Sequence, residues 1–119
     1  MNWKKLKVWK ETHSLVLEIY KVTSTFPKSE TYGLINQLKR ASYSVPANIV
    51  EGQYRNTTKE YLQFLYNSRG SLEEIRYFLL LSLDLKFLSE NIYDELEKRY
   101  ESASKMLNGL IKSLKSSSK

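Results

Sequence analysis

The chain has no cysteine, two prolines, four glycines and one histidine among its 119 residues. Without cysteine it can form neither a disulfide nor a thiolate metal site, and one histidine cannot supply the several ligands that a metal centre needs. Because prolines and glycines are so few, long regular elements meet few interruptions. These absences exclude disulfide-stabilised folds and cysteine-dependent enzymes, and we predict no metal or other cofactor.

The chain also lacks a long hydrophobic run. Its longest apolar stretch, residues 78–81, is far shorter than the roughly 20 residues that span a membrane. In the first ten residues, lysines interrupt the apolar positions, so there is no continuous apolar segment of the kind that a secretory signal contains. We therefore expect a cytoplasmic protein with no membrane contact.

Apolar residues make up 41% of the chain and aromatic residues 13%, which is ample for a packed core. Chains of about this length usually form one core. We therefore predict a single domain over residues 1–119, in which residues 116–119 are a frayed tail.

Apolar residues recur every three or four positions in four separate blocks, which is the period of an α-helix. This spacing predicts helices over residues 3–25, 30–52, 58–85 and 90–115. Connections as short as these require neighbouring helices to be antiparallel. The predicted fold is therefore all-α, an antiparallel up-down-up-down four-helix bundle.

Local signals support the ends of these helices. Ser29 is a plausible N-cap for the second helix, and Gly52 a plausible C-cap. Residues 57–60, Thr-Thr-Lys-Glu, have the form of a capping box, and Ser89 can cap the fourth helix. In the first helix, His13 falls on the predicted apolar stripe, so we expect it to be a core or interface partner and not a metal ligand.

The second predicted helix contains the segment 44–52, SVPANIVEG, with a proline inside a helical pattern. Pro46 removes one main-chain hydrogen bond, and we predict that it bends a continuous helix. At about 100° per residue, five polar residues form one narrow stripe beside the apolar line, and should be partly buried. They are Gln37, Arg40, Ser44, Asn48 and Glu51.

An enzyme could use Glu51 as a base and Arg40 as an anion clamp, but no nucleophile, metal cluster or phosphate loop accompanies them. We therefore predict a structural network and no catalytic activity. Gly70 interrupts the third helix without breaking its apolar period, which predicts close approach of another helix there. That helix is apolar over more than one face, so we also expect self-association.

The charge is unevenly distributed. In the predicted topology, the start of the first helix, the turn between the second and third, and the end of the fourth meet at one end of the bundle. We call the basic residues of this end the lysine-rich pole: Lys4, Lys5, Lys7, Lys10, Arg55, Lys59, Lys112, Lys115 and Lys119. These nine face three acidic residues, whereas the other ten basic and ten acidic residues cancel, so the whole net charge of +6 collects here.

A concentrated basic surface binds phosphate backbones by releasing counterions, so RNA or DNA is the predicted partner. No helix-turn-helix or other base-reading module is evident. The alternative is that the lysines only keep the chain ends soluble. The protein would then be a protein–protein assembly or scaffold module that binds no nucleic acid.

Three segments, QLKRA (37–41), SVPANIVEG (44–52) and GSLEE (70–74), together with Phe26-Pro27 and YGL (32–34), resemble a bacterial four-helix-bundle family. That family includes proteins encoded in intervening sequences of large-subunit ribosomal RNA genes, and it is distantly similar to accessory proteins of diversity-generating retroelements. The resemblance implies a bundle that assembles as a homopentamer with no known catalytic activity. For the retroelement relatives it implies that a basic surface binds nucleic acid and a reverse transcriptase. The family motif residues themselves, the polar stripe with Pro46 and Gly70, are better suited to folding and assembly.

Overall fold

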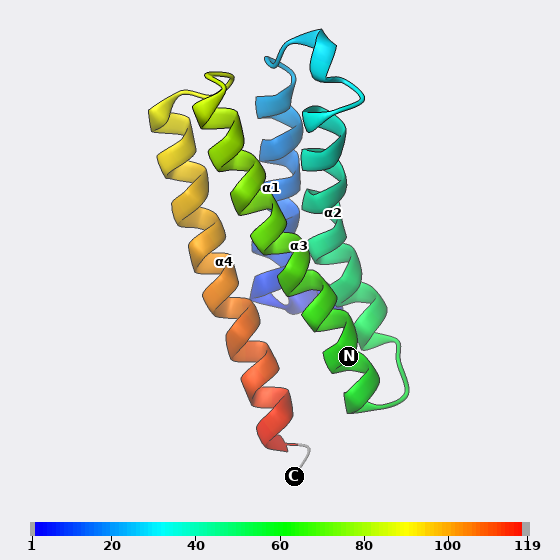
Figure 1. Cartoon of the computed structure of the whole chain (residues 1–119). Coiled ribbons are helices and arrows are strands. Elements are labelled where there is room, and N and C mark those ends of the chain that lie inside the picture. The colour runs from blue at the N-terminus through cyan, green and yellow to red at the C-terminus, as the bar shows by residue number, and fades with distance from the viewer. Residues whose placement is uncertain (1, 118–119) are drawn as a thin grey trace.

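The computed structural model describes residues 2–117, and within them it contains helices and no strand. In chain order the elements are η1 (Trp3–Lys5), α1 (Lys7–Thr23), η2 (Lys28–Glu30), α2 (Leu34–Gln53), α3 (Thr58–Asp84) and α4 (Glu90–Ser117). The four α-helices run alternately up and down, which confirms the predicted four-helix bundle (Figure 1). The start of the chain, the α2–α3 connection and the end of α4 lie together at the lower end of this view.

Helix boundaries differ from the prediction at the first two helices. Residues 3–5 form a separate 3-10 turn, in which Asn2 Oδ1 accepts a hydrogen bond from the Lys4 amide at 3.0 Å, so α1 begins only at Lys7. The predicted N-cap at Ser29 is wrong, because the residues after Pro27 form η2. The second helix begins at Leu34 instead, where the Leu34 amide donates to Glu30 Oε1 at 3.3 Å.

The caps of the last two helices are confirmed. The Glu60 amide donates to Thr57 Oγ1 at 3.1 Å, and the Thr57 hydroxyl donates to Glu60 Oε1 at 3.0 Å. The Ile92 amide donates to Ser89 Oγ at 3.2 Å. The fourth helix continues to Ser117, two residues beyond its predicted end. The frayed tail stays a prediction, and residues 118–119 lie outside the described part of the chain.

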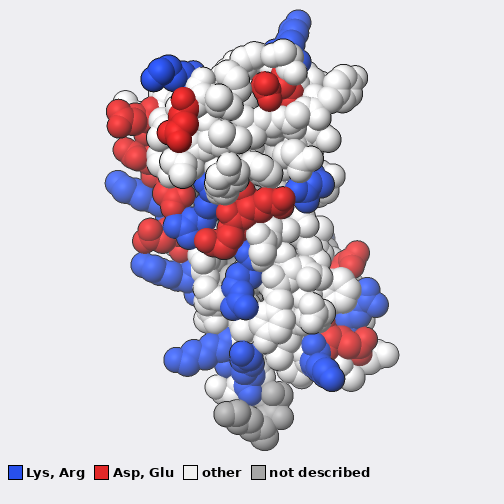
Figure 2. All heavy atoms as spheres, in the orientation of Figure 1, with Lys and Arg blue, Asp and Glu red and all other residues white. Residues whose placement is uncertain are grey.

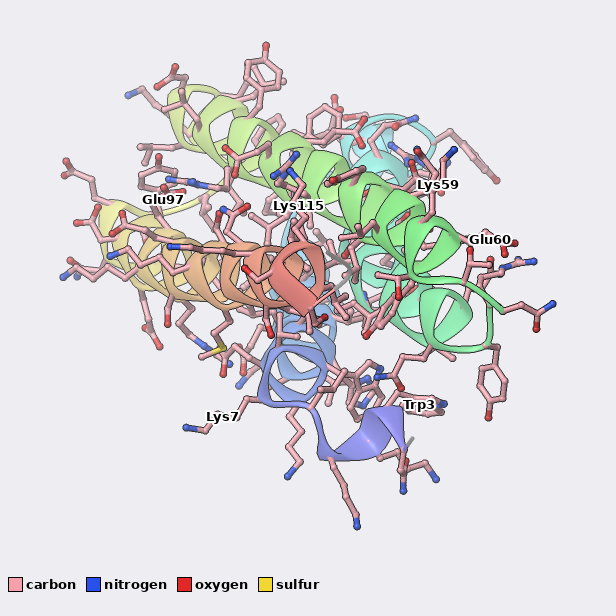
Figure 3. All side chains as sticks on the ribbon, turned by 90° about the horizontal axis from the view of Figure 1, so that it is seen from below. Trp3, Lys7, Lys59, Glu60, Glu97 and Lys115 are labelled. Atoms are coloured by element: carbon pink, nitrogen blue, oxygen red, sulfur yellow. The ribbon has the colours of Figure 1, made fainter. Side chains whose placement is uncertain are left out.

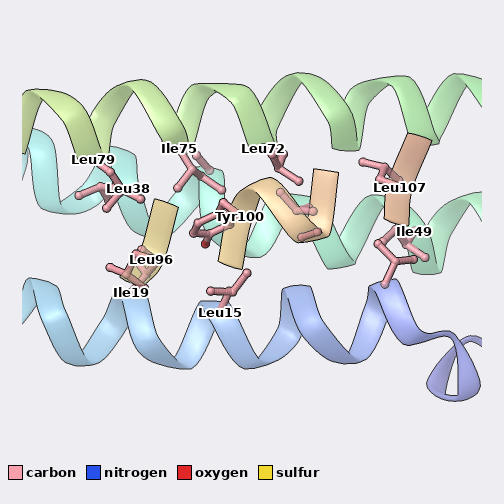
Figure 4. Close-up of a cluster of buried hydrophobic side chains, with 14 of the residues drawn as sticks. Leu15, Ile19, Leu38, Ile49, Leu72, Ile75, Leu79, Leu96, Tyr100 and Leu107 are labelled. Atoms are coloured by element: carbon pink, nitrogen blue, oxygen red, sulfur yellow. The ribbon is translucent and has the colours of Figure 1, made fainter. Parts of the chain in front are cut away.

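One continuous core joins the four helices, and Figure 4 shows its central cluster with Tyr100 in the middle. Tyr100 is 1% exposed, and its hydroxyl has no hydrogen-bond partner among the described residues. Burial raises the pKa of this hydroxyl, because the phenolate would lose its hydration.

The buried face of α1 contains two threonines as well as apolar residues. The buried line includes Thr12 and Thr23, whose hydroxyls donate to the carbonyls of Val8 and Ile19 at 2.8 and 2.7 Å. Because these bonds satisfy the hydroxyls within the helix, threonine is tolerated in the core. His13 is exposed on a flanking face of α1, so the predicted core position is wrong, and a role at an interface stays a prediction.

Each pair of neighbouring helices is also joined by a charged side chain. Arg40 of α2 pairs with Glu74 of α3 at 3.0 Å. Arg76 of α3 donates to Glu97 of α4 at 2.9 Å. In the remaining two pairs, Arg99 of α4 lies 2.9 Å from Glu11 of α1, and Lys39 of α2 lies over the Tyr20 ring of α1. The α3–α4 face accordingly carries a mixed band of both signs at mid-height (Figure 2).

Candidate nucleic-acid interface

Three segments that are distant in the sequence meet at the lysine-rich pole. Figure 3 looks onto this end and shows Lys7 of α1, Lys59 of α3 and Lys115 of α4 on different sides of the bundle. The eight described basic residues of the pole are all exposed, and Lys119 lies outside the described residues. The antiparallel topology therefore gathers these charges on the surface of one end.

Acidic side chains neutralise the pole only in part. Glu51 lies 3.7 Å from Arg55, and Glu11 is occupied by Arg99, a residue of the middle band. Among residues 2–117, no acidic side chain forms an ion pair with the lysines of the first turns. These lysines are Lys4, Lys5, Lys7 and Lys10. Their positive charge is therefore available to a ligand.

Aromatic rings hold several of the cations in place. The Lys4 ammonium lies 5.5 Å from the Trp3 ring centroid, and the Arg55 guanidinium lies 4.5 Å from that of Phe64. Lys115 Nζ lies 5.8 Å from the ring of Tyr66. A cation over an aromatic face gains electrostatic attraction and keeps its charged head in water. The pole is thus a surface of both cations and aromatic rings.

Arg69 is a basic residue of this surface that sequence reasoning missed. Its guanidinium lies 5.1 Å from the Tyr66 ring, over which Lys115 also lies, and it donates to Asn108 Oδ1 of α4 at 3.2 Å. The spacing of Tyr66 and Arg69 by three helical positions could have indicated the contact. Because the three side chains join α3 to the end of α4, Arg69 extends the basic surface from the pole up the α3–α4 face.

The polar stripe of α2 faces α3. Arg40 donates to Gln37 Oε1 at 2.9 Å as well as to Glu74, and Asn48 Nδ2 donates to the Ser44 carbonyl at 2.7 Å. The Ser71 hydroxyl donates to Ser44 Oγ at 3.2 Å. The stripe thereby links the 44–52 segment to the 70–74 segment, so its polar groups serve the contact between two helices.

Two predictions for this part of the molecule are wrong, those for Glu51 and, within one chain, for Gly70. Pro46 is buried inside α2, which continues through it, and the predicted bend stays a prediction. Glu51 is exposed and turns away from the stripe towards Arg55. No atom lies within 4 Å of a Cβ built on Gly70, so no other helix of the described chain approaches that glycine. A close approach at Gly70 would have to come from another molecule.

The family model described as 23S rRNA-intervening sequence protein matches residues 4–109. The chain belongs to this family. A solved structure from Bacteroides thetaiotaomicron, described as a protein with unknown function from the S23 ribosomal protein family, superposes with a TM-score of 0.82 at 18% identity. The match covers 88% of this chain and 95% of the other, and it shows that the two share a fold. No curated protein matches the chain.

In this member of the intervening-sequence protein family, the residues considered for catalysis are not brought together. Arg40 is held by Gln37 and Glu74, whereas Glu51 pairs with Arg55 about 16 Å further along the helix. Within residues 2–117, no three His, Asp or Glu side chains are grouped so that they could hold a metal ion. No helix in that range is both long and apolar enough to cross a membrane.

Proposed function

We propose that this protein is a non-enzymatic, cytoplasmic, homo-oligomeric bundle protein that binds RNA or DNA, alone or within a ribonucleoprotein partner, through the lysine-rich pole. The observation that carries this proposal is the convergence of exposed lysines from three separate chain segments at one end. A cluster of this kind attracts a phosphate backbone through counterion release.

Arginine and lysine side chains differ in how they are paired, and this difference supports the proposal. All five arginines of the chain have a partner. Arg40, Arg76 and Arg99 form the ion pairs that join helices. Arg55 pairs with Glu51, and Arg69 donates to Asn108. A planar guanidinium suits such fixed pairs, whereas a lysine on a flexible stem suits a mobile phosphate backbone. The lysines of the first turns, which lack acidic partners, are therefore well placed for an external anion.

Self-association is part of the proposal, with the pentamer that the family resemblance implies as the expected state. The outer faces of α1 and α3 expose large apolar side chains, with Leu17 61%, Tyr77 59% and Leu80 43% exposed. Exposed apolar groups that cluster on a helix face favour burial against another molecule. The uncovered Gly70 of α3 offers a point where a second helix can approach closely.

The same apolar faces favour the alternative function, a protein–protein assembly module without nucleic-acid binding. A partner of that kind could be another protein, such as a reverse transcriptase. A stable oligomer that binds no RNA or DNA at low salt is the result that this alternative predicts.

The test is charge reversal at the two ends of the bundle. One variant changes four lysines of the pole to glutamate: Lys4, Lys5, Lys7 and Lys10. The matched control changes four exposed lysines near the opposite end or in the upper half of α4: Lys21, Lys28, Lys86 and Lys98. Both variants lose the same net charge, so a difference between them reports position and not total charge.

Binding is measured by fluorescence anisotropy with a labelled RNA of about 30 nucleotides and with DNA of the same sequence. We expect the pole variant to bind about a hundredfold more weakly or worse, and the control to keep most of the affinity. Equal losses in both variants would show that the attraction is not localised. Unchanged binding by the pole variant would make the proposal wrong.

A further inference from the structure

An aromatic groove lies at the lysine-rich pole, between the first turns of the chain and α2. It has a volume of about 430 Å³, and it opens to solvent. Trp3, Trp9 and His13 form one side, and Tyr43 and Pro46 of α2 lie on the other. Figure 3 shows Trp3 between η1 and α2, on the end of the bundle that carries the lysines.

The rings of this groove are ordered by one another and by the core. The Trp9 and His13 rings are stacked, with centroids 4.9 Å apart and an angle of 5° between their planes. Trp3 meets Trp9 at 4.7 Å and 59°. Trp9 also packs against the buried core, which fixes its orientation. His13 and Tyr43 are exposed, so flat aromatic surfaces face the solvent in a fixed arrangement.

Basic residues lie next to the residues that line the groove. Lys4 lies over Trp3. Lys10 follows Trp9 in the sequence, about 100° further around α1, and is exposed. The acidic residue that lines the groove is Glu51, and its carboxylate lies 3.7 Å from Arg55. A ligand for this groove should therefore carry flat rings together with negative charge.

We propose that this aromatic groove is a base-stacking site for single-stranded nucleic acid. One or two unpaired bases stack on the ring surfaces of Trp3 and His13, and the flanking phosphates lie on Lys4 and Lys10. Stacking platforms beside basic grooves bind single strands without sequence preference, because every base has an aromatic face. The proposal rests on the proposed function, since the same pole supplies the phosphate contacts.

Charge favours this occupant over an apolar protein segment, because Lys4 lies over Trp3 at the edge of the groove and no acidic side chain of residues 2–117 pairs with it. Strand preference distinguishes it from simple attraction to phosphate. In a duplex the bases are stacked on one another and cannot reach the groove, whereas the lysines bind either form. The groove therefore turns a general polyanion surface into one that prefers single strands.

The experiment uses intrinsic fluorescence, because the chain's two tryptophans both line the groove. The full-length protein is titrated with an oligouridylate of about 15 nucleotides, and with a duplex RNA of the same length. We expect the single strand to quench the tryptophan emission as it binds, and the duplex to bind more weakly with little quenching. Tighter binding of the duplex, or binding of the single strand without quenching, would overturn the proposal.

Two substitutions remove stacking surface without changing the number of lysines, Trp3→Ala and His13→Ala. Each should weaken single-strand binding about tenfold, within the range measured for a lost base–aromatic contact. The matched control is Tyr32→Ala, at a tyrosine that is 94% exposed in the α1–α2 connection at the opposite end, and it should bind like the wild type. Because His13 is exposed, its variant is expected to fold even if Trp3→Ala does not.

The outcomes separate this proposal from the proposed function. If both stacking variants bind normally while reversal of the four pole lysines abolishes binding, the groove takes no base but the pole still binds nucleic acid. If the wild type binds no nucleic acid at low salt, both proposals are wrong. If Trp3→Ala or His13→Ala dissociates the oligomer in a solution mass measurement, the groove is a contact between copies and the stacking site is wrong.

Discussion

Gly52, at the end of α2, makes the packing of the bundle testable with a single methyl group. A Cβ built on Gly52 would lie 2.7 Å from Cδ1 of Tyr61 and 3.1 Å from Cβ of Phe64, both in the first turns of α3. The helix continues through Gly52 without a positive φ, so the glycine is needed for space and not for its backbone freedom. Gly52→Ala should therefore force α2 and α3 apart at the lysine-rich pole.

Two opposing effects set the magnitude. Alanine in place of a helical glycine stabilises a helix by about 0.5–1 kcal/mol. Overpacking a tight contact costs about 1–3 kcal/mol, and here the neighbour is a half-buried aromatic ring that packs against the core. We expect Gly52→Ala to lower the free energy of unfolding by about 1–2 kcal/mol.

Gly109 of α4 is the matched control, because no atom lies within 4 Å of its built Cβ. Gly109→Ala should raise the free energy of unfolding by about 0.5–1 kcal/mol. In thermal melts at one protein concentration, each kcal/mol corresponds to about 3–5 °C for a chain of this size. The two variants should therefore melt on opposite sides of the wild type.

Equal stability of the two variants would refute the close contact between Gly52 and α3. A double-mutant cycle with Tyr61→Ala identifies the clashing ring. If the clash is with Tyr61, Gly52→Ala costs less when that ring is absent. An unchanged cost would mean that the destabilisation has another source.

Three further substitutions test separate features of the molecule. Gly70→Ala should stabilise the fold as Gly109→Ala does, but if another copy packs at Gly70 it should also reduce the mass of the oligomer in light scattering, which Gly109→Ala should not. Tyr100→Phe should raise the free energy of unfolding in urea by about 1 kcal/mol, because it removes a buried hydroxyl without a partner, and a loss of stability would reveal a hidden hydrogen bond. Lys86→Gly should raise the melting temperature by a few degrees, since Lys86 ends α3 with a φ of 65° that glycine adopts without strain, and a lower melting temperature would contradict this reading of the turn.

The positions of α3 and α4 in the sequence could be predicted because they depend on local signals. The apolar period of α3 and α4 is regular, and the caps at Thr57 and Ser89 depend on residues within three positions. The start of α2 could not be predicted in the same way. Ser29 is a good cap residue, but the turn after Pro27 directs the carboxylate of Glu30 to that position instead.

The position of His13 was predicted wrongly because residues at helical apolar spacing cover both the buried face of α1 and a flanking face of that helix. Thr12 and Thr23 are buried since each hydroxyl binds a carbonyl of its own helix, which the sequence pattern does not reveal. His13 and Tyr20 fit the apolar period equally well but lie on the flanking face. That face contributes to the aromatic groove, so the wrong assignment also concealed a candidate site.

The lysine-rich pole could be located from topology alone, because the order of helices determines which chain segments share an end. The pairing of its charged side chains with other residues could not be predicted. Glu11 is one of the three acidic residues that the sequence places at this end, yet it pairs with Arg99, 88 positions away. The charge count from the sequence left Arg69 outside the pole, yet Arg69 and Lys115 both lie over the Tyr66 ring. Such pairings depend on helix register, which spacing within one helix does not determine.

The central claim, that the lysine-rich pole binds a nucleic-acid backbone by charge, is tested most directly by the salt dependence of binding. The affinity of the wild-type protein for a single-stranded RNA is measured between about 50 and 200 mM salt. Four or more phosphate contacts predict a slope of log affinity against log salt of about −3 or steeper, and the four-lysine variant should have a much flatter slope. An affinity that does not change with salt, or no binding even at the lowest salt, would contradict the account.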